Sequence, residues 1–297
     1  MKACRAGGVS APGSLRYPAG MAAPENDPTA PKGDRAPTPA ATPPAVLFDL
    51  TGKRAVVVGG TGVLGGAIAE TLAAAGAELI IVGRGEAAGN EVADRIKAAG
   101  GSAAVITADA TRREDLESLR DQLLADGGPP DVLVNAAGVN AATPFLEISD
   151  DEWHKIFRVN LDSVRLACQI LGPAMLERGS GSIMNLASMS AEIPLSRVFT
   201  YSASKAAVLN LTRNLAREWA PQGVRVNALS PGFFPAEQNR DILSPDRVAA
   251  IMNHTPMNRF GEPGELAGAV LLLASDAGRF MTGTNLCVDG GFSAMTI

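Results

Sequence analysis

The sequence is poor in the residues that build metal and disulfide sites. Its 297 residues include three cysteines (Cys4, Cys168 and Cys287) and two histidines (His154 and His254). The cysteines have neither paired nor metal-type spacing, which excludes a disulfide scaffold and a zinc ribbon. The motifs H-E-x-x-H and G-x-S-x-G are also missing, so we expect neither zinc-dependent nor triad hydrolysis and no metal site.

Positive charge and long uninterrupted apolar runs are also scarce. The net charge of −5 argues against a general nucleic-acid binder. No apolar core follows the basic start, as a secretory signal would require. The most apolar region, 54–82, is broken by six glycines and by Glu70 and Glu78, which argues against a membrane span. We therefore expect a cytoplasmic protein whose partners are neither nucleic acid nor membrane.

The first 45 residues differ in composition from the rest. They hold nine of the 20 prolines and have almost no apolar periodicity. Such a segment cannot bury enough surface to offset its chain entropy. We predict a disordered Pro/Ala-rich tail over 1–45, in which Met21 is a second in-frame methionine, and one folded domain over 46–297.

Within the domain, short apolar runs alternate with segments of helical composition. The expected strands are 54–58, 78–82, 103–107, 132–135, 181–186, 225–229 and 285–288. The expected helices lie near 63–75, 86–99, 112–125, 150–177, 199–220 and 263–274. Apolar strands that alternate with helices are typical of a parallel sheet covered on both faces. The prediction is an α/β fold, a single Rossmann-type doubly wound domain with a seven-stranded parallel sheet.

A glycine cluster joins the first strand to the first helix. The spacing G-x-G-x-x-G is met by Gly60, Gly62 and Gly65. Glycines there let the backbone approach a pyrophosphate, which the helix N-terminus then attracts. The alternative is a tight turn without a ligand. A Walker phosphate loop is excluded, because no Lys-Ser/Thr follows Gly65.

The end of the second strand bears on the choice of cofactor. NAD-binding folds usually place an acidic residue there, on the ribose 2′-hydroxyl. This sequence has Arg84 instead. A guanidinium can bind a 2′-phosphate bidentately, so NADP is favoured over NAD. The alternative is that Arg84 stacks on adenine, which suits either cofactor.

One tyrosine of the domain has a lysine four residues later. Tyr201 and Lys205 share a face of the predicted helix 199–220. A nearby ammonium favours phenolate, so we expect a lowered pKa for Tyr201 and proton exchange with a carbonyl or alcohol oxygen. Ser188 follows the strand 181–186 and could bond the same oxygen.

Taken in order, these motifs resemble the short-chain dehydrogenase/reductase family over nearly all of 48–297. The matching pieces are the glycine turn 59–65, Asp109-Ala110, Asn135-Ala136-Ala137-Gly138, Asn160, Ser188, Tyr201, Lys205, Pro231-Gly232 and Val288-Asp289-Gly290-Gly291. The resemblance implies a Rossmann-type sheet and a homotetramer or homodimer packed through the long helices.

The resemblance also implies roles. Tyr201 would be the general acid/base, Lys205 would bind the nicotinamide ribose and tune Tyr201, Ser188 would orient the carbonyl, and Asn160 would hold a proton-relay water. The implied cofactor contacts are Gly59, Thr61, Gly62, Leu64, Gly65, Arg84, Asp109, Ala110, Asn135, Ala136, Gly138, Tyr201, Lys205, Pro231 and Gly232. Val63 replaces the middle glycine of the usual turn, and Ala236 replaces a usual threonine.

The segments 231–240 and 254–261 look like the D-mannonate oxidoreductase (fructuronate reductase) branch of the family. Candidate contacts to a sugar-acid substrate are Arg197, Gln238, Asn239 and Arg240. The stretch 139–152 is short for that branch, so we expect a different cover over the substrate. The alternatives are a gluconate 5-dehydrogenase-like enzyme, another ketone reductase, or a dinucleotide-binding regulator without turnover.

Overall fold

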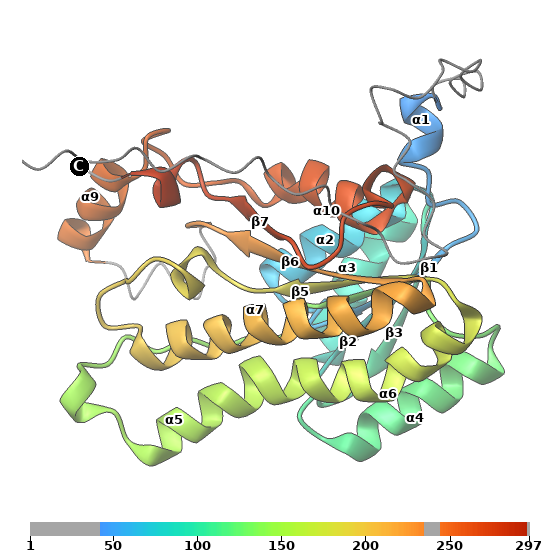
Figure 1. Cartoon of the computed structure of the whole chain (residues 1–297), viewed down its shortest axis with the longest axis horizontal. Coiled ribbons are helices and arrows are strands. Elements are labelled where there is room, and N and C mark those ends of the chain that lie inside the picture. Colours follow the sequence, from blue (N-terminus) through green and yellow to red (C-terminus); the bar gives the residue numbers. More distant parts are fainter. Residues whose placement is uncertain (1–41, 235–243, 296–297) are drawn as a thin grey trace, which may run out of the picture. The chain divides into compact units, whose positions relative to one another are not determined.

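The computed structural model describes residues 42–234 and 244–295 (Figure 1). At its centre lies a seven-stranded, all-parallel sheet with strand order β3-β2-β1-β4-β5-β6-β7. The strands are β1 (Arg54–Val58), β2 (Glu78–Gly83), β3 (Ser102–Thr107), β4 (Val132–Asn135), β5 (Gly181–Leu186), β6 (Val224–Pro231) and β7 (Asn285–Val288). The predicted fold class is confirmed.

The strands are apolar because the inner ones are buried on both faces. In β1, Val56 pairs with Ile80 on one side and with Leu133 on the other. Val56 and Val58 face one hydrophobic core, whereas Ala55 and Val57 face the other. Runs of β-branched residues therefore replace the alternation expected of a half-exposed sheet.

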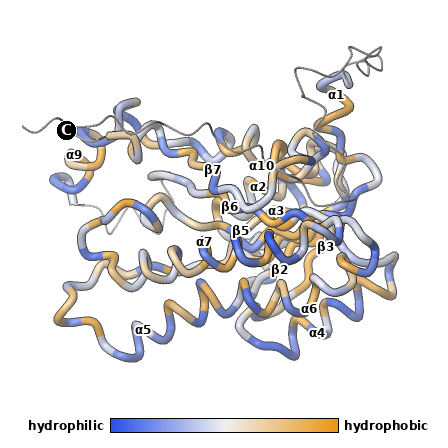
Figure 2. The backbone as a smooth tube through the Cα atoms, in the orientation of Figure 1, coloured by the Kyte–Doolittle hydropathy of each residue, from blue (hydrophilic) through white to orange (hydrophobic). Residues whose placement is uncertain are grey.

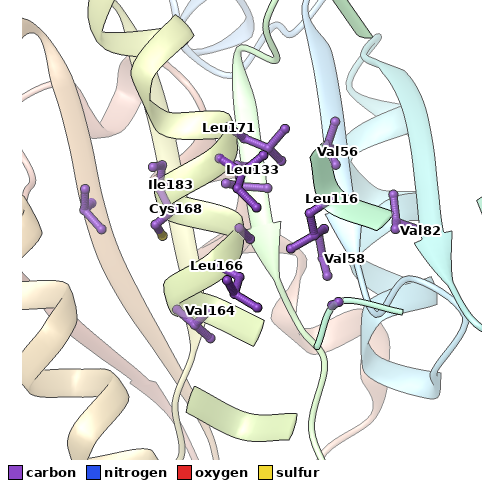
Figure 3. Close-up of a cluster of buried hydrophobic side chains, with 14 of the residues drawn as sticks. Val56, Val58, Val82, Leu116, Leu133, Val164, Leu166, Cys168, Leu171 and Ile183 are labelled. Atoms are coloured by element: carbon purple, nitrogen blue, oxygen red, sulfur yellow. The ribbon is translucent and has the colours of Figure 1, made fainter. Parts of the chain in front are cut away.

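Helices cover both faces. One face carries α2 (Val63–Ala74), α3 (Glu86–Ala98) and α10 (Ala267–Ala274), and the other carries α4 (Arg113–Ala125), α6 (Ser163–Arg178) and α7 (Phe199–Trp219). Figure 3 shows the core that contains Val56 and Val58, where Leu116 of α4 lies beside these valines and Leu166 and Leu171 of α6 lie on the side of Leu133. Along α3 and α4 hydrophobic and hydrophilic residues alternate (Figure 2), so each presents an apolar stripe to the sheet. Helix α10 has no polar side chain.

The strand order fixes where a ligand can bind. From β1 the chain proceeds to β2 and β3, then returns to the other side of β1 with β4. At such a switch point the two connections leave in opposite directions and open a crevice at the carboxyl ends of the strands. The turns after β1, β4 and β5 all lie along this edge.

The sequence predicted the strands better than some of the helices. The predicted helix 150–177 is α5 (Asp150–Phe157), a π-helical turn (Arg158–Asp162) and α6. The predicted helix 263–274 begins as a 3-10 turn (Pro263–Leu266) before α10. Two helices were not predicted, α9 (Pro245–His254) and the short α1 (Pro44–Leu47). Further 3-10 turns are Phe145–Glu147, Met189–Ala191, Ala220–Gln222, Asp276–Gly278 and Phe292–Ala294.

The short helix α1 starts inside the predicted tail, whose residues up to 41 lie outside the described part. Among the residues that the structure describes, no helix is both long and apolar enough to span a bilayer.

A buried polar chain joins β4, β5 and α7 through the core. Asn135 Nδ2 donates to Asn185 Oδ1 (2.8 Å), and Asn185 Nδ2 donates to Thr212 Oγ1 (2.9 Å). All three side chains are almost fully buried. The Asn135 side chain therefore lies in the core between neighbouring strands.

We expect Asn185→Ala to lower the free energy of unfolding by about 2–4 kcal/mol, because it removes the oxygen acceptor of the Asn135 amide, leaves that amide only the weak acceptor Cys168 Sγ, and opens a cavity. Urea denaturation measures the loss. Exposed Asn210 on α7 supplies the control, since Asn210→Ala should change stability by less than about 0.5 kcal/mol. Equal stability of the two variants would contradict a structural role for the buried chain.

Candidate active site

The glycine turn is shaped by two close approaches of the backbone. Gly59 has φ +85°, and a Cβ there would overlap the backbone of Ala137, which follows β4. A Cβ on Gly65 would overlap the carbonyl of Gly59. Only glycine permits both contacts, so the first turn of α2 lies directly on the strand-to-helix turn.

This cradle fits a dinucleotide pyrophosphate. Gly62 is the N-cap of α2, and within the described residues no side chain bonds to the free N–H groups of that helix end. Backbone N–H groups and the positive end of the helix dipole favour a phosphate there. Thr61 and Leu64 belong to the same turn and are half-buried.

Arg84 and Asp109, the candidates for contacts to the adenosine, lie close enough for the Arg84 charge to act on the Asp109 carboxyl. Arg84 follows β2 and is exposed. Asp109 Oδ1 accepts hydrogen bonds from Thr111 N (2.9 Å) and Thr111 Oγ1 (2.8 Å). Burial opposes ionisation of Asp109, but the Thr111 hydrogen bonds and the charges of Arg84 and Arg112 together hold its pKa below the usual value. Asp109 is therefore a carboxylate with its second oxygen available, and Ala110 lies beside it.

Asn160 is held at the centre of the crevice by the π-helical turn. Its Oδ1 accepts from Val139 N (2.8 Å), and its Nδ2 donates to Val139 O (3.0 Å) and to Ser204 Oγ (3.0 Å). Ser204 Oγ in turn donates to the carbonyl of Tyr201 (2.7 Å). Both amide hydrogens of Asn160 are thus taken by the protein, whereas its Oδ1 accepts one hydrogen bond, from Val139 N.

Lys205 occupies the floor of the site on α7, one turn after Tyr201. Its Nζ lies 5.8 Å from the centroid of the Tyr201 ring and donates to the carbonyl of Leu186 at the end of β5 (2.7 Å). Only 4% of Lys205 is exposed, and burial lowers its pKa to about 8. A Cβ on Gly138 would lie 3.5 Å from both Lys205 Nζ and Asn160 Oδ1, so the absence of a side chain at Gly138 leaves space beside the ammonium.

Ser188 and Tyr201 complete the group. Burial raises the pKa of the Tyr201 phenol, and a hydrogen bond with Ser188 opposes the rise only in part. The lowered pKa expected from the sequence is therefore wrong for this structure, because loss of solvent outweighs the neighbouring groups. At neutral pH the phenol is protonated, which is the form that can donate to a carbonyl oxygen.

The remaining cofactor candidates line the same edge. Ala136 and Gly138 follow β4, and Pro231-Gly232 follow at the end of β6. A Cβ on Gly232 would come within 2.6 Å of Asp289 Cα, so this turn lies tightly against the segment after β7. The side chain of Asn135 is buried away from the crevice, which leaves its backbone as the group nearest to that edge.

Of the substrate candidates, the structure describes Arg197. It is exposed, lies between Ser188 and Tyr201, and has φ +64°, an uncommon conformation for arginine. Arg247 of α9 donates to the neighbouring carbonyl of Ser196 (3.0 Å) and so ties α9 to this loop. Gln238, Asn239 and Arg240, together with Ala236, lie outside the described residues.

The structure adds two serines that sequence reasoning missed. Ser204 links Asn160 to Tyr201, and Ser190 bonds to Ser188. The regular Tyr-Ser-Ala-Ser-Lys spacing could have indicated Ser204, since a residue three positions after Tyr201 lies near it on the helix. Across 42–234 and 244–295 no group of His, Cys, Asp and Glu side chains is arranged to hold a metal ion.

The chain is similar to known enzymes. The family model described as enoyl-(acyl carrier protein) reductase matches residues 61–293. Galactitol 2-dehydrogenase (L-tagatose-forming) of Cereibacter sphaeroides is 41% identical over 250 residues, 83% of this chain and 97% of that protein. The 5-keto-D-gluconate 5-reductase of Escherichia coli K12 is 33% identical over 246 residues, 82% of this chain and 97% of that one.

The chain is also similar in fold to a solved structure. The gluconate 5-dehydrogenase from Burkholderia cenocepacia J2315, in complex with NADP and tartrate, is 34% identical with a TM-score of 0.81. The match covers 85% of this chain and 99% of that one.

The buried ammonium generates a pH prediction. The pKa of Lys205 is about 8 in the native protein and has its ordinary value of 10.5 in the unfolded chain. At pH values between these two, the lysine carries a proton in the unfolded state that it has released in the native state. Raising the pH through this window therefore stabilises the native state. From pH 8 to about pH 9.5 the protein should gain about 2 kcal/mol of unfolding free energy relative to its Lys205→Met variant. Urea denaturation at several pH values measures the difference, and a flat or falling difference would contradict a buried charge at Lys205.

Proposed function

The chain belongs to the short-chain dehydrogenase/reductase family and is an oxidoreductase that acts on CH–OH groups, and we propose that its substrate is a sugar acid or polyol. The pair 5-keto-D-gluconate and gluconate is the first choice. The observation that carries the proposal is the grouping of Ser188, Tyr201 and Lys205 at the crevice, together with relatives named for gluconate-type acids and for galactitol. D-Fructuronate and D-mannonate, the pair expected first from the sequence, have less support from these relatives.

Each residue of the site has one task. In the direction of reduction, the Tyr201 phenol donates its proton to the carbonyl oxygen while Ser188 donates a hydrogen bond to the same atom. The Lys205 ammonium stabilises the phenolate that remains. When bound, the nicotinamide supplies the hydride that reaches the carbonyl carbon.

Overall, a ketone, a reduced nicotinamide cofactor and one proton give a secondary alcohol and the oxidised cofactor. Tyr201 is reprotonated at the end of the cycle. Asn160 Oδ1 and Lys205 Nζ both border the space beside Gly138. We propose that a water in this space, bound to Asn160 Oδ1, takes part in returning the proton. Oxidation of the alcohol runs through the same atoms in reverse.

The proposed cofactor contacts follow the crevice from one end to the other. Arg84, Asp109 and Ala110 hold the adenosine, the turn 59–65 holds the pyrophosphate, and Asn135–Gly138, Tyr201, Lys205 and Pro231-Gly232 hold the nicotinamide riboside. We propose NADP as the preferred cofactor, because Arg84 is exposed at the end of β2 where an acidic residue would repel a 2′-phosphate.

The proposal for the substrate end uses Arg197, whose exposed guanidinium lies in the loop between Ser188 and Tyr201 and is suited to a sugar-acid carboxylate. Gln238, Asn239 and Arg240 remain predictions for the hydroxyls. The homotetramer or homodimer implied by the family likewise remains a prediction.

We expect Arg84→Ala to weaken NADPH binding about tenfold or more and to leave NADH binding nearly unchanged, because one charge-assisted contact to the 2′-phosphate is lost. Equilibrium fluorescence titration measures both. The control is Arg95→Ala, since exposed Arg95 pairs with Glu70 (2.7 Å) on the neighbouring helix. Equal weakening for NADPH and NADH would show that Arg84 only stacks on the adenine.

The function is tested by following oxidation of NADPH and NADH with 5-keto-D-gluconate, L-tagatose and D-fructuronate as substrates. We expect turnover with the first or the second, and a loss of at least about a hundredfold in kcat for Tyr201→Phe with cofactor binding retained. Turnover with D-fructuronate alone would favour D-fructuronate and D-mannonate as the substrate pair. If Tyr201→Phe kept its rate, the catalytic assignment would be wrong, and if no carbonyl were reduced, a cofactor-binding regulator would be the better account.

A further inference from the structure

Ser188 carries two hydrogen bonds that its role as a donor does not require. Its Oγ accepts from the backbone N–H of Ser190 (3.2 Å) and from the Ser190 hydroxyl (3.0 Å). Both serines are buried, with exposed fractions of 7% for Ser188 and 4% for Ser190. Ser190 therefore has no solvent competing for its hydroxyl, and Ser188 receives both of its donors from one residue.

Counting donors and acceptors fixes the direction of the Ser188 proton. A serine hydroxyl has one hydrogen to donate and two lone pairs to accept with. Both lone pairs of Ser188 are used by Ser190, so its hydrogen must point to a third group. Without substrate the neighbouring group is the Tyr201 hydroxyl, and with substrate bound it is the carbonyl oxygen that receives the Tyr201 proton.

The turn that holds Ser190 is anchored at both ends. Before it, Ala187 N donates to Leu229 O of β6 (2.9 Å). After it, the Glu192 carboxylate accepts from Arg213 of α7 (3.2 Å) and from Asn285 of β7 (3.2 Å). These contacts tie the segment around the 3-10 turn Met189–Ala191 to two strands and a helix.

We propose that Ser190 is a positioning residue, whose hydroxyl occupies a lone pair of Ser188 and thereby commits the Ser188 hydrogen to the reacting oxygen. Without the Ser190 hydroxyl, one lone pair of Ser188 is free and its hydrogen can rotate away. Ser188 could then accept a hydrogen bond from the Tyr201 phenol, which would hold the proton that Tyr201 must transfer. This inference rests on the oxidoreductase activity and not on the choice of substrate.

The first test is Ser190→Ala in the full chain, assayed on a carbonyl–alcohol pair that the unchanged enzyme converts. We expect kcat to fall about threefold to tenfold, as for loss of one hydrogen bond. In the oxidation direction the apparent pKa of the catalytic base should move upward, because the Tyr201 phenolate loses an aligned donor. Affinity for NADPH should not change.

The control is Ser182→Ala. Ser182 is equally buried (3% exposed) and donates to Leu273 O (2.7 Å), but it lies at the start of β5, at the far end of that strand from Ser188. We expect its kcat and pH profile to match those of the unchanged enzyme. A second variant, Ser190→Cys, keeps nearly the same volume with a weaker donor and should shift the pH profile in the same direction by less.

A readout that needs no substrate separates this inference from the proposed function. The chain has two tyrosines, Tyr17 and Tyr201, so ring-labelled tyrosine in a Tyr17→Phe background reports the Tyr201 phenol alone by NMR titration. Ser190→Ala should raise its pKa. An unchanged pKa and pH profile in both Ser190 variants would overturn the proposal, even if kcat fell, because that pattern indicates a structural role only. Failure of 5-keto-D-gluconate as a substrate would instead bear on the proposed function.

Discussion

The buried ammonium of Lys205 is the constraint on which the site depends. A lysine in the interior is costly unless its hydrogens are bonded, and the Leu186 carbonyl at 2.7 Å accepts one of the three. The bond joins α7 to the end of β5, the strand that leads into Ser188. The same charge lies beside the Tyr201 ring, where it can stabilise a phenolate. Packing of the helix and chemistry of the site therefore rest on one contact.

The two ends of the crevice are built by different means. At the glycine turn the shape comes from missing side chains, since a Cβ on Gly59 or Gly65 would overlap a neighbouring backbone. At the reacting end it comes from hydrogen bonds: Asn160 to Val139 and Ser204, and Ser190 to Ser188. Backbone contacts suit a cofactor with a constant pyrophosphate, whereas aligned donors suit an oxygen atom that gains or loses a proton.

The sequence predicted the sheet and most of the site because those features depend on local composition. Apolar runs marked the strands, and Tyr201 and Lys205 were visible from helical spacing. The π-helical turn at Asn160 escaped prediction because its extra residue is held by Val139, which lies in another segment. The pKa of Tyr201 was predicted in the wrong direction, since burial depends on the whole fold. Ser190 carried no signal, because a serine near a strand end is ordinary until its partner is seen.

The most direct test of the account follows the transferred hydrogen itself. Reduced cofactor carrying deuterium at nicotinamide C4, on the face that is transferred, is incubated with 5-keto-D-gluconate and the enzyme, and the product is examined by mass spectrometry and NMR. The account predicts one deuterium on the former carbonyl carbon, and at least about a hundredfold slower formation of this product when Tyr201→Phe replaces the enzyme. Product formed without deuterium would contradict direct hydride transfer at this site.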